Sequence, residues 1–307
     1  MCHSSLRVKV HSMKKIVNKP IYINLLWSFP LIFYAADANA WGLYTHLFFS
    51  QWLMLSTPLL GSATLNPKIQ QAVKMFPKLV LAGACLPDLA VVAKAFSSTH
   101  QWHKAEQMMQ NAETDEEIAI AVGYSSHLFV DVVAHNHFVP AHEAKWAHIN
   151  WLNKSVVAHI TSEWAMDAHI DKQVTHCPHH LILSNLDSLS TFIAPYFAVT
   201  KQQAKHKLRL LAWLDGLLRI SQLSSAILWI LKLSDAEFVK NLAYYITKTS
   251  HALTHFEQSL QGIRPNWQPE LNHLSAAEML AWREQCLRDL SMRLATPIHY
   301  YATNNNH

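Results

Sequence analysis

Glycine is scarce in this 307-residue chain, with six residues in all. A β-sheet fold of this length normally needs more, because tight strand connections depend on glycine. Half of the residues are apolar, and they recur at helical spacing over long stretches. We therefore expect an all-α fold, a single helical domain of about eight to ten helices. Helices are expected near residues 43–57, 67–84, 101–111, 114–135, 152–171, 184–197, 200–232, 234–261 and 275–294.

Two helix starts carry a capping signal. Thr114 is followed by Glu117, and Ser234 by Glu237, which is the spacing at which the two side chains satisfy each other's backbone N–H groups. We therefore expect helices to begin after Thr114 and after Ser234.

Cysteine is also rare, with four residues, of which Cys85, Cys177 and Cys286 follow residue 40. An odd number excludes a closed disulfide framework in that part of the chain. One disulfide with a free thiol and three buried thiols both remain open.

A charge excess is missing once the first forty residues are set aside. Residues 1–40 hold five of the 25 Lys and Arg and one of the 21 Asp and Glu, which leaves 20 of each sign. This balance gives no indication of a surface built to coat a polyanion.

Residues 1–40 have the pattern of a signal peptide. Five basic residues precede an apolar run from Ile21 to Tyr34, and the tripeptide 38–40, Ala-Asn-Ala, is of the type that signal peptidase cuts after. The run is short and interrupted for a membrane span, although an uncleaved anchor is the alternative. We expect export to the periplasm or the medium, with cleavage after Ala40 and a mature domain at 41–307.

Residues 208–233 form a strongly apolar stretch, interrupted by Arg209, Asp215, Arg219 and Lys232. Charges near a bilayer centre are costly, so we expect a buried helix or helical hairpin rather than a membrane span. A surface in peripheral contact with lipid is a third option.

Histidine is abundant, with 21 residues, and its spacing is informative. His127 and Asp131 are four residues apart, as are His159 and Glu163, so each pair shares one face of a helix. Either pair alone is usually an ion pair, but two pairs together indicate a metal site, since zinc accepts imidazole nitrogen and carboxylate oxygen. His135 and His137 follow the first pair.

Two further segments carry candidate ligands. Asp88 follows an apolar run and a proline turn, and His100 and His103 come soon after it. After cleavage, Trp41 would be the N-terminal residue, five residues before His46. A free α-amino group has a pKa of about 8 and can bind zinc when neutral.

Together these residues resemble the zinc-dependent phospholipases C of bacteria, a family that is similar to the fungal single-strand-specific nucleases. The resemblance covers residues 41–167 and rests on nine ordered positions: Trp41, His46, Asp88, His100, His127, Asp131, His137, His159 and Glu163. The close spacing of Trp41 and His46 is that of the nucleases, whereas Glu163 matches the lipases.

The resemblance implies a cleft between helices that holds three zinc ions, with two as the minimum. The first would be held by Asp88, His100, His127 and Asp131. The second would be held by His137, His159 and Glu163. The third would be held by the Trp41 amino and carbonyl groups with His46 and the bridging Asp131, and Asp88 would orient or deprotonate the attacking water.

Two ligands have competitors. His103 competes with His100, and the nearby Trp102 favours His100. His135 competes with His137, and the family spacing favours His137. Ligation by His135 would put the three-ion arrangement in question.

Three functions remain. The first is hydrolysis of phospholipids by metal-activated water, which gives diacylglycerol and a phosphorylated head group. The second is a zinc-dependent nuclease or nucleotidase, whose nucleic-acid bases would stack on Trp102 or Trp164. The third is a non-catalytic metal-binding protein of the cell envelope.

Overall fold

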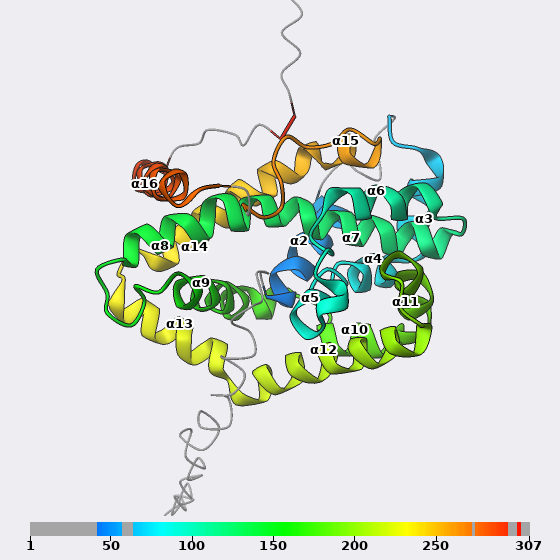
Figure 1. Cartoon of the computed structure of the whole chain (residues 1–307), viewed down its shortest axis with the longest axis horizontal. Helices are drawn as coiled ribbons and strands as arrows, with labels where there is room; N and C mark the ends of the chain where they lie inside the picture. Colours follow the sequence, from blue (N-terminus) through cyan, green and yellow to red (C-terminus); the bar gives the residue numbers. More distant parts are fainter. Residues whose placement is uncertain (1–41, 57–63, 272–273, 294–299, 302–307) are drawn as a thin grey trace, which may run out of the picture.

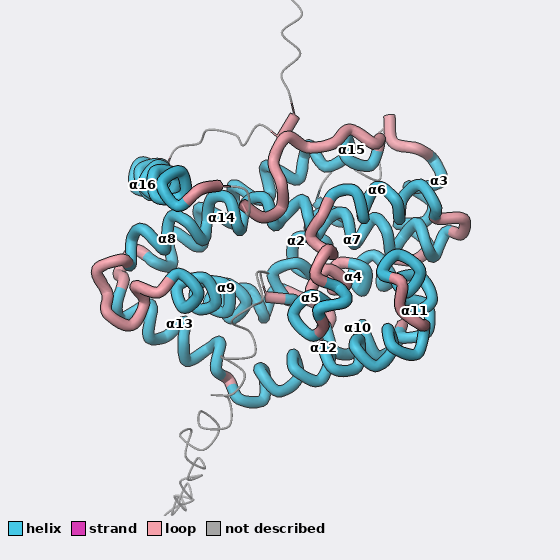
Figure 2. Tube along the Cα trace, viewed as in Figure 1, coloured by secondary structure: helices cyan, strands magenta, loops and turns pink. Residues whose placement is uncertain are grey.

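The computed structural model describes residues 42–56, 64–271, 274–293 and 300–301, and within them it is helical with no β-strand (Figures 1 and 2). The all-α prediction is therefore confirmed. In chain order the helices are α2 (Leu43–Ser56), α3 (Pro67–Met75), α4 (Pro77–Gly83), α5 (Leu89–Val92), η3 (Lys94–Phe96), α6 (Trp102–Asn111), α7 (Asp115–Val133), η4 (Ala134–Phe138), α8 (Val139–Trp146), α9 (Ser155–Ile170), η5 (Asp171–Gln173), α10 (Pro178–Ser184), α11 (Leu186–Ile193), η6 (Ala194–Phe197), α12 (Lys201–Ser221), α13 (Leu223–Ser234), α14 (Phe238–Ala252), η7 (Leu253–His255), α15 (Phe256–Leu260) and α16 (Ala276–Met292).

One of the two capping signals is found. The Thr114 side chain accepts from the Glu117 backbone N–H, and the Glu117 side chain accepts in return, so α7 begins as predicted. The prediction for Ser234 is wrong, because this residue ends α13 and its hydroxyl donates to the carbonyl of Ile230. Helix α14 begins only at Phe238.

There are more helices than the eight to ten expected, because several predicted segments are interrupted. The stretch 67–84 is divided at Phe76, where Pro77 starts a new helix. The stretch 200–232 is divided at Gln222, whose φ of 55° turns the chain into α13. Local spacing gives the same apolar period on both sides of such a break.

Helix α7 forms the centre of the core. Nearly its whole length is buried, and α4 crosses it closely. A Cβ on Gly123 would lie 1.9 Å from the Val80 carbonyl oxygen, and one on Gly83 would lie 2.3 Å from the Ile120 oxygen. Two of the few glycines therefore bring α4 and α7 into backbone contact, which fixes the helix that carries His127 and Asp131.

Two stretches have the apolar character of a membrane span. Residues 115–146 are long and apolar enough, and their most apolar window is fully buried. Helices α12 and α13 are long and apolar enough for a membrane span only when they are taken together. They bend by 53° at their junction, along the lower edge of Figure 1. Length and composition alone do not distinguish such helices from core helices.

The bent pair differs from the fully buried hairpin expected for residues 208–233. Its inner face packs into the core through buried side chains such as Leu208, Leu211 and Leu231. Its outer face exposes large apolar side chains: Trp213, Ile220, Trp229, Ile230 and Leu233. The pair is thus amphipathic, with an apolar outer face.

The three cysteines of the described residues form no disulfide. Cys85 and Cys286 are buried, and Cys177 is partly exposed. Of the two alternatives, the structure favours separate thiols.

Candidate metal centre

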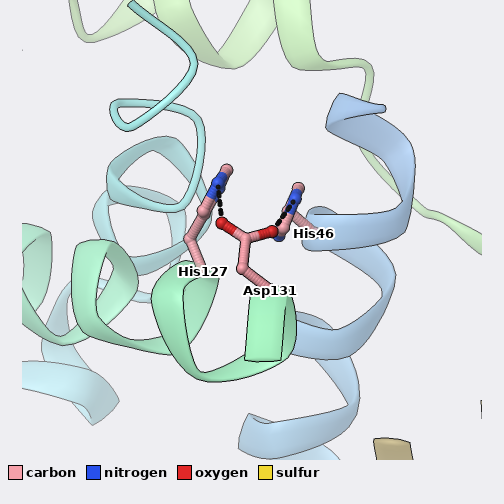
Figure 3. Close-up of side chains that lie close together, drawn as sticks. All are labelled: His46, His127 and Asp131. Carbon is pink, nitrogen blue, oxygen red and sulfur yellow. Dashed lines mark ion pairs between the residues drawn. The ribbon is translucent and has the colours of Figure 1, made fainter. Parts of the chain in front are cut away.

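Helices α2 and α7 bring the first group of ligands together. Figure 3 shows the Asp131 carboxylate directed towards both His46 and His127, with one oxygen paired to each. Its Oδ1 lies 3.3 Å from His46 Nε2, and its Oδ2 lies 3.0 Å from His127 Nε2. The two rings stack with centroids 3.4 Å apart. All three side chains are fully buried.

A second group forms where the segment between α4 and α6 passes over α7. It consists of Asp88, His100 and His127. The Nε2 atoms of His100 and His127 are 3.3 Å apart, and Asp88 Oδ1 lies 3.8 Å from the latter. The competitor His103 is exposed on α6, so the structure places His100 and not His103 in the cluster.

A third group lies between η4 and α9. His159 Nε2 is 2.9 Å from Glu163 Oε1, and His135 Nδ1 is 3.8 Å from the same oxygen. His135 Nε2 also lies 3.5 Å from Asp131 Oδ1, so Asp131 connects this group to the first.

The family spacing led us to His137 in this group, and the structure corrects this to His135. His137 is six residues after Asp131, which places it on a different side of the helix, whereas His135 is about one turn away. The His137 ring packs against Trp267 and Trp282 at 5.4 and 5.6 Å between centroids. Burial lowers its pKa to about 3, as expected for a histidine in an apolar pocket.

Seven of the nine predicted ligands therefore converge: His46, Asp88, His100, His127, Asp131, His159 and Glu163. His135 joins them in the place of His137. Trp41 and the proposed signal peptide, residues 1–40, lie outside the described residues.

The protonation states suit metal binding. Burial lowers the pKa of His46 well below its ordinary value and lowers that of His100 to about 3, so both rings are neutral. Burial alone would lower the pKa of His127 and raise that of Asp131, but the ion pair between them outweighs burial, so the pKa of His127 is raised and that of Asp131 is held well below its ordinary value. A bound cation would displace the proton of His127, which would leave neutral imidazoles around an ionised carboxylate.

Several polar atoms of the cluster are buried and make no hydrogen bond of suitable geometry within the described residues, although some of them lie close to one another. They are Asp88 Oδ1, both oxygens of Asp131, both ring nitrogens of His135, His159 Nε2 and Glu163 Oε1. Such atoms are costly to bury, and a bound cation would satisfy them. Burial also raises the pKa of Asp88 and of Glu163, which a cation would reverse. The donor set therefore fits zinc, which prefers nitrogen and carboxylate ligands.

His127 can serve only one ion. Its Nδ1 donates to the Ala84 carbonyl oxygen at 2.7 Å, which leaves Nε2 as the single ligand atom. If His127 binds with Asp88 and His100, an ion between His46 and Asp131 needs further ligands. The sequence predicts the amino group of Trp41 for this place, and Trp41 lies outside the described residues.

A residue that sequence analysis missed fixes the start of α2. The buried Asp167 carboxylate accepts from the backbone N–H of Thr45 at 2.8 Å and of Tyr44 at 3.3 Å. A Cβ on Gly42 would lie 2.1 Å from Asp167 Oδ2. Asp167 therefore holds the first turn of the helix that carries His46. Its position four residues after Glu163, on the same face of α9, was a signal for it.

The centre opens to a cavity of about 190 Å³. His135 and His159 line it, together with Glu143, Glu270 and Arg283. Arg283 donates to Glu143 Oε2 at 2.6 Å, so this cation is paired.

Comparison with known proteins gives one family match. The model of the zinc dependent phospholipase C family matches residues 45–211, a range that contains all eight residues of the three groups. No curated protein and no solved structure matches the chain. Because the match spans more than half of the sequence, the chain belongs to the zinc-dependent phospholipase C family.

Proposed function

We propose that this protein is an exported phospholipase C that hydrolyses the phosphodiester of phospholipids, releasing diacylglycerol and a phosphorylated head group. The observation that carries the proposal is the convergence of three ligand groups around Asp131 inside the family-matched region. A phosphodiester is anionic, so a site that concentrates positive charge is needed to bind it and stabilise its transition state.

The three groups suggest three zinc positions, and His135 in the place of His137 does not remove one of them, because His135 forms a separate group with His159 and Glu163. One position would use Asp88, His100 and His127. A second would use His135, His159 and Glu163, and a third His46 with Asp131, which lies between the positions. Zinc bound there would neutralise the phosphate oxygens and lower the pKa of a bound water towards 7.

Asp88 is the side chain best suited to handle the proton of the attacking water. Burial raises its pKa in the metal-free protein, but a bound cation would lower that pKa again, so the role rests on the position of Asp88 beside His100 and His127 in the cluster. Its Oδ1 is buried and has no hydrogen-bond partner within the described residues. This oxygen would accept the proton and hold the water in line with the phosphorus.

Export and cleavage after Ala40 complete the proposal. The new amino group of Trp41 would lie one residue before Gly42, whose backbone is held against Asp167. The chain therefore supplies a fixed point from which the amine could reach the ion beside His46. Retention of residues 1–40, or one extra residue before Trp41, should remove that ligand and lower activity strongly.

The outer face of α12–α13 supports peripheral contact with lipid. Trp213 and Trp229 are 58% and 63% exposed, and Ile220 and Leu233 are 76% and 68% exposed. Tryptophan on an amphipathic helix is favoured at the membrane interface. Replacement of Trp213 and Trp229 by alanine should reduce co-sedimentation with phosphatidylcholine vesicles several-fold. The control Met75→Ala, an exposed side chain on α3, should not, and equal losses would remove this face from the proposal.

The test of the function is head-group release from phosphatidylcholine, phosphatidylethanolamine and phosphatidylinositol vesicles, with and without a chelator. Release of diacylglycerol that stops with the chelator and returns with zinc is expected. Zinc-dependent digestion of single-stranded DNA without lipid cleavage would support the nuclease instead. Bound zinc with no turnover of either substrate class would support a non-catalytic metal-binding protein.

A further inference from the structure

A segment outside the family-matched region is fastened over the metal centre. Residues 264–271, here called the C-terminal strap, follow α15. The backbone carbonyl of Trp267 accepts from the indole N–H of Trp102 at 2.7 Å, and that of Gln268 accepts from the Asn136 amide at 2.8 Å. Each donor is a near neighbour of a ligand, two residues after His100 and one after His135. The strap is therefore held by the same segments that carry the ligands.

The strap places Glu270 at the cluster. Its side chain is one-fifth exposed, and Glu270 lines the cavity together with His135 and His159. Its Oε1 lies 3.5 Å from Nδ1 of His100. The other ring nitrogen, Nε2, points towards Asp131 Oδ2 at 3.5 Å. Glu270 thus stands behind His100 as seen from the metal site.

The chemistry of a metal-bound imidazole gives this placement a role. A ring that binds through Nε2 carries its proton on Nδ1, and an acceptor there fixes the ring and raises its basicity. His127 uses the carbonyl of Ala84 for this purpose. For His100 the Thr99 hydroxyl lies 3.3 Å from Nδ1, but its own proton goes to the Pro87 carbonyl, so it offers a neutral oxygen only. Glu270 offers a charged one.

We propose that Glu270 is a positioning residue of the metal centre. Its carboxylate accepts a hydrogen bond from the Nδ1–H group of His100 and so orients that ring towards the ion that His100 would share with Asp88 and His127. This inference rests on the metal centre proposed above. It assigns a part of the centre to a segment that the family match does not include.

The experiment compares Glu270→Ala and Glu270→Gln in the full mature protein. The control is Glu284→Ala, an exposed carboxylate on α16 that also lies outside the matched region. Zinc affinity is measured by competition with a chromophoric chelator. Cobalt replaces zinc in a parallel sample, so that the visible absorption reports the ligand geometry. Each substitution is repeated in a His100→Ala background to form a double-mutant cycle.

We expect Glu270→Ala to weaken one zinc position about 10- to 100-fold and to change the cobalt spectrum, because outer partners of metal ligands have effects of this size. Glu270→Gln should lie between it and the wild type, and the control should be unchanged. In the His100→Ala background the substitution should have no further effect.

Equal losses in both backgrounds, or unchanged zinc affinity in Glu270→Ala, would overturn the role of Glu270 while leaving the proposed function intact. A wild-type protein that binds no zinc would overturn both. The melting temperature of the zinc-free variants shows whether they fold, and Glu270→Gln keeps the shape of the side chain if the alanine variant does not.

Discussion

Asp131→Asn is the most informative single substitution, because four imidazoles surround this carboxylate. Their nitrogen atoms lie 3.0, 3.3, 3.5 and 3.5 Å from its oxygens, in the order His127, His46, His100 and His135, and the side chain is fully buried. Asparagine keeps the shape but removes the charge and turns one acceptor into a donor. At about 4 Å and an effective dielectric constant of about 20, two unit charges interact by about 4 kcal/mol, so the gross attraction to a divalent ion is about 8 kcal/mol.

Most of that attraction is offset by the hydration that a carboxylate loses on burial. We expect a net loss of about 3 kcal/mol, or zinc binding about 100-fold weaker, at the positions that Asp131 serves. Chelator competition measures the affinity, and elemental analysis after dialysis measures the zinc that remains. Glu116→Gln, on the exposed start of the same helix, is the matched control. Zinc affinity of wild-type strength in Asp131→Asn would refute the shared-ligand arrangement.

Three further predictions follow from the site and its surroundings. His135→Ala should remove about one zinc ion per chain by elemental analysis, whereas His137→Ala should keep the full complement. The reverse result would show that His137 is the ligand, as the family spacing predicts. Burial lowers the pKa of His142 to about 4, so this residue contributes stability above the unfolded pKa of about 6.5 and loses it as the pH falls towards 4. The free energy of unfolding of the zinc-free protein should therefore fall between pH 7 and pH 4 by about 3 kcal/mol more than that of His142→Leu, and parallel curves would contradict this. Gly42→Ala should cost about 1–3 kcal/mol in urea unfolding, because its Cβ would lie 2.1 Å from Asp167, and an unchanged midpoint would show that the contact relaxes freely.

The pairs that lie within one helix could be predicted from the sequence. A spacing of four residues fixes His127 beside Asp131 and His159 beside Glu163 regardless of how the helices pack. The all-α class followed from scarce glycine and helical periodicity in the same way. These properties are local, and local spacing determines them.

The choice between His135 and His137 depended on which criterion was used. Helical spacing from Asp131 favoured His135, and the family offset favoured His137. The chain forms a π-helical turn at Ala134–Phe138, and there His135 faces the cluster while His137 packs against Trp267 and Trp282. Periodicity in the sequence does not show on which residues such a turn falls.

The contributions of Asp167 and Glu270 could not be predicted because they arise from tertiary packing. Asp167 meets the backbone of Thr45 from 122 residues away in the chain. Glu270 reaches His100 only because α6 and η4 bind the strap through side chains. No spacing rule relates residues at such separations.

Native mass spectrometry of the protein, purified after expression with residues 1–40 included, tests the central claim most directly, because one spectrum gives both the start of the chain and its bound metal. We predict a chain that begins at Trp41 and carries three zinc ions, which are released together with activity by a chelator. A chain that begins at Trp41 and holds fewer than two zinc ions would contradict it.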